Sequence, residues 1–221
     1  MLRRVTEKFF SLFIYIFYKQ IGTKFRTDAF KFFLDIFFVV FEKAGFRFDV
    51  ISSNYIKLYT DLVEKEISMA KISSKDRILI MGCGSLPATS ALIVMKTKAD
   101  IVAIDTDQRA AQEASQYFKN LNLNGQITVE HADGLKYPVD EFDVIFVLHG
   151  VRQQKEVLNY LAENIQDKTR IIFRTVCDEK GKPSGKSLDV SHLFSVEDCV
   201  RSEYLGSVDS LLLSKKCKRT D

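Results

Sequence analysis

The Gly-rich segment Gly82-Cys83-Gly84-Ser85-Leu86-Pro87 has the composition of a ligand-binding turn. It follows a short apolar run, residues 77–81, and precedes a stretch with helical character. Glycine lets the backbone turn sharply and approach a ligand closely, and proline suits the first turn of a helix. Strand, Gly-rich turn and helix N-terminus in this order are typical of a nucleotide pocket at the carboxyl edge of a parallel sheet. Alone, a Gly-x-Gly pattern is a weak signal.

Two carboxylates strengthen this interpretation. Asp105 ends the second predicted strand, 21 residues after Gly84, where a carboxylate can accept hydrogen bonds from both ribose hydroxyls of an adenosine ligand. Asp133 and Gly134 follow the third predicted strand; the carboxylate would accept from an adenine amino group, and the glycine would leave room for the ring. Each also has a structural alternative. Asp105 would cap the next turn, and Asp133-Gly134 would form an ordinary turn.

Tyr55 and His149 are the candidate catalytic residues. His149 follows the fourth predicted strand, and an imidazole there could act as a general base; a loop histidine without a catalytic role is the alternative. Tyr55 and Tyr59 stand on a predicted helix ahead of the first strand and could reach over the ligand. Tyr59 also fits the apolar stripe of that helix.

From residue 75, short β-branched runs alternate with helical stretches, which predicts a parallel sheet with helices on both faces. Strands are expected at 77–81, 101–104, 127–130, 144–147 and 171–174, and helices at 87–96, 108–121 and 154–166. Asp107 is expected to begin the second of these helices. Two further runs, 199–205 and 208–215, predict an antiparallel hairpin around Gly206-Ser207.

This order of elements resembles the class I S-adenosylmethionine-dependent methyltransferase superfamily over about residues 75–216. The resemblance implies an α/β, Rossmann-like sheet, mainly parallel with a C-terminal antiparallel hairpin, and S-adenosylmethionine as the donor co-substrate. It also implies where the donor would bind: the methionine part at Gly82 and Gly84, the ribose at Asp105, the adenine at Asp133 and Gly134, and Leu148 lining the same cleft.

A branch of this superfamily is more similar still at the turn. Met81 stands where many members have an acidic residue, and Pro87 stands at the third glycine position. Both differences, together with the segment GCGSLPATS, resemble nicotianamine synthase-like proteins, as does the Asn54-Tyr55 pair. We therefore expect a methyltransferase acting on a small molecule or protein side chain. A nicotianamine synthase-like 3-amino-3-carboxypropyl transferase is the alternative, and a non-catalytic adenosine-ligand-binding protein is a further one.

Composition limits the partners. The net charge is only +3, which argues against a dedicated nucleic-acid binder. Four cysteines lie far apart with no metal-ligand spacing, so reduced thiols in a cytoplasmic protein and no metal site are expected. The apolar runs 9–18 and 29–41 are too short or too interrupted to span a membrane. Contact with a membrane surface and the oligomeric state are left open.

The first 50 residues differ from the rest of the chain. They contain 13 of the 18 Phe residues and nine Lys or Arg against five Asp or Glu. Helices are expected at about 7–19, 28–43 and 53–71, the first two apolar on most sides and therefore packed on two faces. The predicted organisation is an N-terminal helical cap, residues 1–72, and an S-adenosylmethionine-binding domain, residues 73–221.

Overall fold

The computed structural model describes residues 49–123, 125–176, 189–202 and 208–216, without the side chains of residues 49–58 and 176. Seven strands form one sheet in the order β3-β2-β1-β4-β5-β7-β6. They are β1 (Arg77–Met81), β2 (Asp100–Asp105), β3 (Ile127–His131), β4 (Val144–Val147), β5 (Arg170–Val176), β6 (Phe194–Arg201) and β7 (Val208–Lys215). The first five are parallel, and β7 pairs antiparallel with both β5 and β6. This confirms the predicted fold class.

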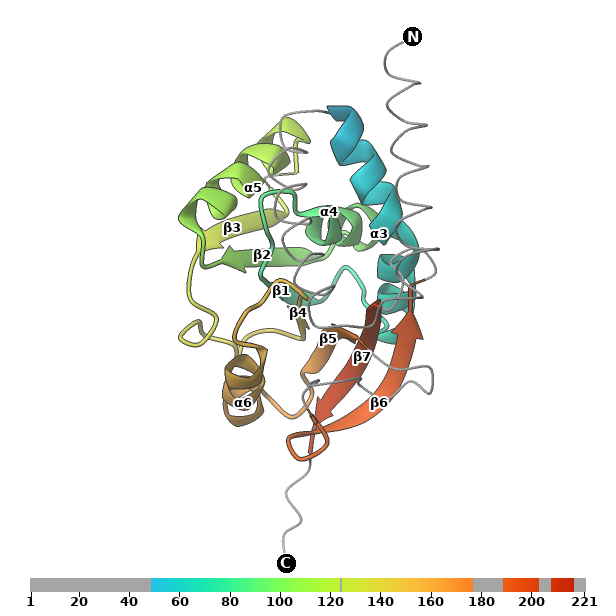
Figure 1. Ribbon diagram of the computed structural model, residues 1–221, viewed down its shortest axis with the longest axis vertical. Helices are drawn as coiled ribbons and strands as arrows, with labels where there is room; N and C mark the ends of the chain where they lie inside the picture. Colours follow the sequence, from blue (N-terminus) through green and yellow to red (C-terminus); the bar gives the residue numbers. More distant parts are fainter. Residues whose placement is uncertain (1–48, 124, 177–188, 203–207, 217–221) are drawn as a thin grey trace, which may run out of the picture.

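The central strands form because their residues are apolar on both faces. In β4 all four side chains are buried, and in β1 only Arg77 is partly exposed. Such continuous apolar runs are typical of parallel strands covered on both sides. The helices α3 (Asp49–Met69), α4 (Ala88–Thr97) and α5 (Gln108–Asn120) cover one face, and α6 (Gln154–Asn164) covers the other (Figure 1).

The connections from β1 and β4 define the place for a ligand. From β1 the chain passes through α4 to β2 on one side, whereas β4 pairs with β1 on the other side. In open α/β sheets ligands bind where the loops after two such strands diverge, at the carboxyl edge of the topological switch point. The Gly-rich turn lies at this edge.

The predicted elements agree with the structure to within about two residues, except that the helix expected at 53–71 begins earlier, at Asp49, and one strand of the hairpin is displaced. The predicted antiparallel hairpin is confirmed, but the bounds expected for its first strand, 199–205, are wrong: β6 spans Phe194–Arg201, and residues 203–205 lie outside the described part. This edge strand is mostly exposed and has a register shift between Val196 and Asp198. A bulge interrupts the alternation of apolar and polar residues by which strands are recognised. The helices expected at 7–19 and 28–43 lie outside the described residues.

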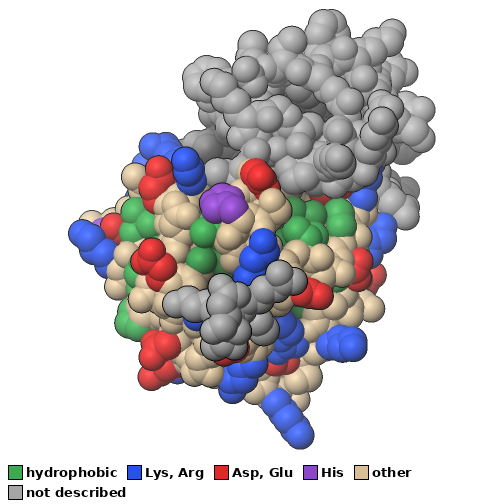
Figure 2. All heavy atoms as spheres, turned by 90° about the horizontal axis from the view of Figure 1, so that it is seen from below, with side chains coloured by type: hydrophobic (Ala, Val, Ile, Leu, Met, Phe, Trp, Pro, Cys, Tyr) green, Lys and Arg blue, Asp and Glu red, His purple; other side chains and the backbone are tan. Residues whose placement is uncertain are grey.

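No helix in the described part of the chain is long and apolar enough to cross a membrane. Figure 2 shows one face of the molecule, on which acidic and basic side chains are intermingled and hydrophobic side chains form small, separated groups.

Candidate functional site

The turn after β1 has a backbone that favours glycine. Gly82 and Gly84 have φ angles of 79° and 67°, in the region that other residues rarely adopt. A Cβ atom added at Gly82 would lie 2.8 Å from Cγ2 of Val151, in the loop after β4. The N–H groups of Gly82 and Cys83 donate to the carbonyl of Ile104 in β2, at 2.9 and 3.2 Å. The turn is therefore fixed against elements on both of its sides.

Asp105, the last residue of β2, is held to this turn through its carboxylate. Oδ2 accepts a hydrogen bond from the N–H of Gly84, and Oδ1 accepts from the N–H of Asp107, each at 2.9 Å. Carboxylate oxygens can accept more than one hydrogen bond, so the backbone orients this side chain and leaves it capacity for a ligand. Asp107 accepts from the N–H groups of Arg109 and Ala110 at the start of α5, as predicted.

The loop after β3 lies beside Asp105. The N–H of Ala132 donates to the backbone carbonyl of Asp105 at 3.0 Å. The exposed Asp133 accepts from the N–H of Leu135 through Oδ1, at 3.0 Å, which is the turn hydrogen bond of the structural alternative. The structure thus brings the two aspartates to one edge of the sheet and gives Asp133 a local partner as well.

Gly134, Leu148 and His149 stand around the end of β1. A Cβ atom added at Gly134 would lie 3.4 Å from Sδ of Met81, so glycine here permits close packing on β1. The buried Leu148 donates its N–H to the carbonyl of Met81 at 3.3 Å. His149 follows, half-buried, with its Nδ1 enclosed. A role in ligand binding or catalysis remains a prediction for all three residues.

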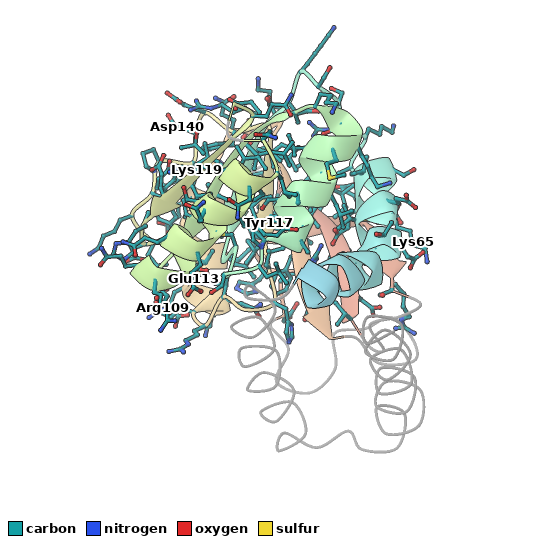
Figure 3. The ribbon with its side chains drawn as sticks, turned by 90° about the horizontal axis from the view of Figure 1, so that it is seen from above. Lys65, Arg109, Glu113, Tyr117, Lys119 and Asp140 are labelled. Carbon is teal, nitrogen blue, oxygen red and sulfur yellow. The ribbon has the colours of Figure 1, made fainter. Side chains whose placement is uncertain are left out.

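Residues from two helices pack against Leu86 and Ala88, which flank Pro87 at the end of the turn. Tyr59 of α3 and Tyr117 of α5 both pack against Leu86 and Ala88, and Figure 3 shows Tyr117 between α5 and α4. Tyr55 lies within α3, one helical turn before Tyr59; its side chain is outside the described part. Tyrosine residues from α3 and α5 therefore pack against the end of the turn.

A buried polar network beneath α3 was not anticipated from the sequence. Arg174 of β5 is 3% exposed and Glu66 of α3 is 0% exposed. Nε and Nη2 of Arg174 donate to the two oxygens of Glu66 at 2.8 and 2.7 Å, and Nη1 donates to Oγ1 of Thr89 at 2.9 Å. Ser210 of β7 donates to the same carboxylate. The available signal was an arginine in the middle of an otherwise apolar strand.

Among the described residues, no three His, Cys, Asp or Glu side chains are grouped as metal ligands would be. Cys83 and Cys199 are free thiols, the first buried and the second exposed. Cys177 and Cys217 lie outside the described part.

The sequence around this site is similar to a known protein family. A model described as "Methyltransferase domain" matches residues 78–168, which run from β1 to the residues just before β5. Over this stretch, which is less than half of the chain, the sequence is similar to class I S-adenosylmethionine-dependent methyltransferases. The strand order and closing antiparallel hairpin are those of this superfamily.

A curated protein similar to this chain is L-histidine 2-aminobutanoyltransferase of Yersinia pestis. It is 27% identical over 124 residues, which cover 56% of this chain and 46% of that protein. The matched part is therefore less than half the length of the relative.

Solved structures share the fold. A mutant of MtNAS, a nicotianamine synthase, in complex with S-adenosylmethionine has a TM-score of 0.73 at 19% identity, covering 84% of this chain and 75% of its own. MtNAS in complex with MTA and tNA has a TM-score of 0.70 at 18% identity, covering 81% and 70%. An RNA methyltransferase from Salinibacter ruber has a TM-score of 0.55 at 15% identity, covering 72% and 94%.

Proposed function

We propose that this protein transfers the 3-amino-3-carboxypropyl group of S-adenosylmethionine to an amine of a small-molecule acceptor. The observation that carries the proposal is that the structural similarity to MtNAS covers more of the chain than the similarity to a methyltransferase does. The MtNAS complex covers 84% of the chain at a TM-score of 0.73, against 72% at 0.55 for the RNA methyltransferase. The name of the Yersinia pestis relative indicates the same type of group transfer. Methyl transfer, the first expectation from the sequence, is therefore less well supported than its alternative.

The residues around the turn supply what the donor needs. Asp105 would accept from the ribose hydroxyls with the acceptor capacity that Gly84 and Asp107 leave free. The backbone of Gly82 and Gly84 would face the methionine part, because no side chain separates it from a ligand. Asp133 would bind the adenine amino group through its second oxygen. Leu148 would complete the apolar side of the cleft.

The protein needs to supply little covalent chemistry for this reaction. The positively charged sulfur makes each attached carbon electrophilic, so the acceptor nitrogen would attack the side-chain Cγ of the methionine part. A C–N bond forms, the S–Cγ bond breaks, its electron pair stays on sulfur as a thioether, and methylthioadenosine leaves. The amine must first be neutral and then lose a proton; His149 and Tyr55 are the proposed groups for this proton transfer. Alignment and exclusion of water are the protein's remaining tasks.

The acceptor is proposed to be an amino acid or a similar small amine. The Yersinia pestis relative has L-histidine in its name. His149, two residues after β4 at the carboxyl edge of the sheet, is the polar residue proposed to face such an acceptor.

A product assay tests the proposal. The protein is incubated with S-adenosylmethionine labelled in its aminocarboxypropyl group, together with L-histidine or other amino acids in turn. We expect methylthioadenosine and a labelled, enlarged acceptor. Formation of S-adenosylhomocysteine without methylthioadenosine would contradict aminocarboxypropyl transfer and restore methyl transfer. Absence of any product with tight donor binding would favour the non-catalytic alternative.

A further inference from the structure

The network of Glu66, Arg174, Thr89 and Ser210 joins four elements of secondary structure. Its members come from α3, β5, α4 and β7. All four residues are buried, between 0% and 4% exposed, and the guanidinium lies over the Tyr59 ring, with Cζ 5.4 Å from the centroid. Such an arrangement holds each partner in a single orientation, because a bidentate guanidinium–carboxylate pair is planar and directional.

Stability alone is a poor explanation for this ion pair. Removing two charges from water costs about as much as their attraction returns, and well-packed apolar residues of similar volume are often equally or more stabilising. What a buried pair can add is one specified geometry. Here the specified geometry is the position of α3 on the sheet.

The network connects α3, which carries the proposed catalytic Tyr55, with the turn that is proposed to bind the donor. Thr89 stands in the first turn of α4, two residues after Pro87, and is therefore next to the Gly-rich turn that is proposed to bind the donor (the donor turn). Glu66 stands on α3, seven positions after Tyr59 and eleven after Tyr55. At 3.6 residues per turn these three positions share one helical face. Arg174 thus links the helix that carries Tyr55 to the start of the helix that follows the turn.

We infer that Arg174 is a positioning residue, which through Glu66 and Thr89 sets α3 against the donor turn so that the acceptor nitrogen, and not water, reaches the donor carbon. This inference rests on the proposed function. Loosening the link would let water attack the same Cγ; the S–Cγ bond breaks, homoserine and methylthioadenosine form, and one proton is released. The network would therefore govern the partition between acceptor and water.

The test uses the full chain with the substitution Thr89→Val, which removes one hydroxyl and keeps the Glu66–Arg174 pair. Thr97→Val is the matched control, because Thr97 stands at the far end of the same helix and its hydroxyl donates to the carbonyl of Ile93. Thr89→Ser returns the hydroxyl. We expect Thr89→Val to raise the ratio of homoserine to transfer product about fivefold, as loss of one buried hydrogen bond allows, and donor affinity to change less than twofold. The control and Thr89→Ser should match wild type.

A second measurement does not depend on the reaction. Addition of S-adenosylmethionine should slow amide hydrogen exchange in α3 of the wild type and of Thr89→Ser, and much less in Thr89→Val. An unchanged product ratio and unchanged α3 protection in Thr89→Val would overturn the inference, whatever happens to its melting temperature. If the wild type instead makes only S-adenosylhomocysteine, the proposed function fails, and the exchange measurement alone decides whether the link exists.

Discussion

At the scale of single residues, the roles of Asp105 and Asp107 can be tested separately. The carboxylate of Asp105 accepts from the Gly-rich turn, whereas that of Asp107 caps α5. Asp105→Ala should weaken S-adenosylmethionine binding by about 1–3 kcal/mol, because ribose hydroxyls would be left unpaired in a closed cleft. Asp107→Ala is the control: it removes the cap of α5 and should cost about 1 kcal/mol of folding stability with donor affinity nearly unchanged. Calorimetry and thermal unfolding separate the two effects. Equal loss of donor affinity in both variants would contradict the assignment.

A second prediction concerns the backbone at Gly82. Gly82→Ala should lower the free energy of unfolding by about 1–3 kcal/mol, because the φ of 79° is strained for alanine and its Cβ would lie 2.8 Å from Val151 Cγ2. Gly125→Ala should change it by less than about 0.5 kcal/mol, because no atom lies within 4 Å of an added Cβ there. Denaturant unfolding measures both. Adding Val151→Ala should recover part of the loss, since it removes the clash and leaves the strained φ.

At the scale of elements, Tyr137 connects the loop after β3 to its surroundings. Its hydroxyl donates to Glu130 of β3 at 3.1 Å, and its carbonyl accepts from the hydroxyl of Tyr160 in α6 at 2.8 Å. Burial, followed by the hydrogen bond to Glu130, raises the pKa of Tyr137 from 10.0 to about 12. The folded state therefore keeps a proton that the unfolded chain loses first, so this stabilisation is complete below about pH 10 and is lost as the pH rises to about 12.

Urea unfolding of wild type and Tyr137→Phe across this pH range tests the point. The free energy of unfolding should fall more steeply with pH in the wild type than in the variant, because only the wild type has this group to titrate. Lysines titrate in the same range in both proteins, so the difference between the two curves isolates Tyr137. Parallel curves would show that the hydroxyl contributes nothing to the pH dependence.

The elements also show how far sequence reasoning reaches. β4 was predicted with its observed bounds because Val144–Val147 is a continuous buried run, and Asp107 was recognised as a cap because capping is a local interaction. β6 was misplaced because an edge strand with a bulge has no clear alternation. Asp105 could be singled out from the sequence because it ends the predicted strand that comes after the Gly-rich turn. The pair Glu66 and Arg174 could not, because residues 108 positions apart meet only when the sheet and α3 are packed.

At the scale of the whole molecule, the Phe-rich first 50 residues are expected to bury apolar surface. Deleting residues 1–48 should give a product that aggregates, because the partner surface of those segments would be exposed to water. Size-exclusion chromatography with light scattering reads this out. A soluble, monomeric product with full transferase activity would instead indicate that the segment serves a membrane or another partner, and vesicle flotation of the full chain would distinguish those two.

The boundary predicted at residue 72 is tested by a larger deletion. Within α3, Leu62, Val63 and Glu66 are all fully buried, so a chain of residues 73–221 would lose apolar packing and leave Arg174 without its carboxylate. An unpaired buried charge costs about 3–5 kcal/mol, and we expect this chain to show no cooperative thermal transition. Replacing the charge by Arg174→Met in the same chain should restore part of the stability, because methionine needs no partner. A chain of residues 73–221 that unfolds cooperatively and binds S-adenosylmethionine as tightly as the full protein would establish the boundary at 72 and make α3 an addition to a self-sufficient domain.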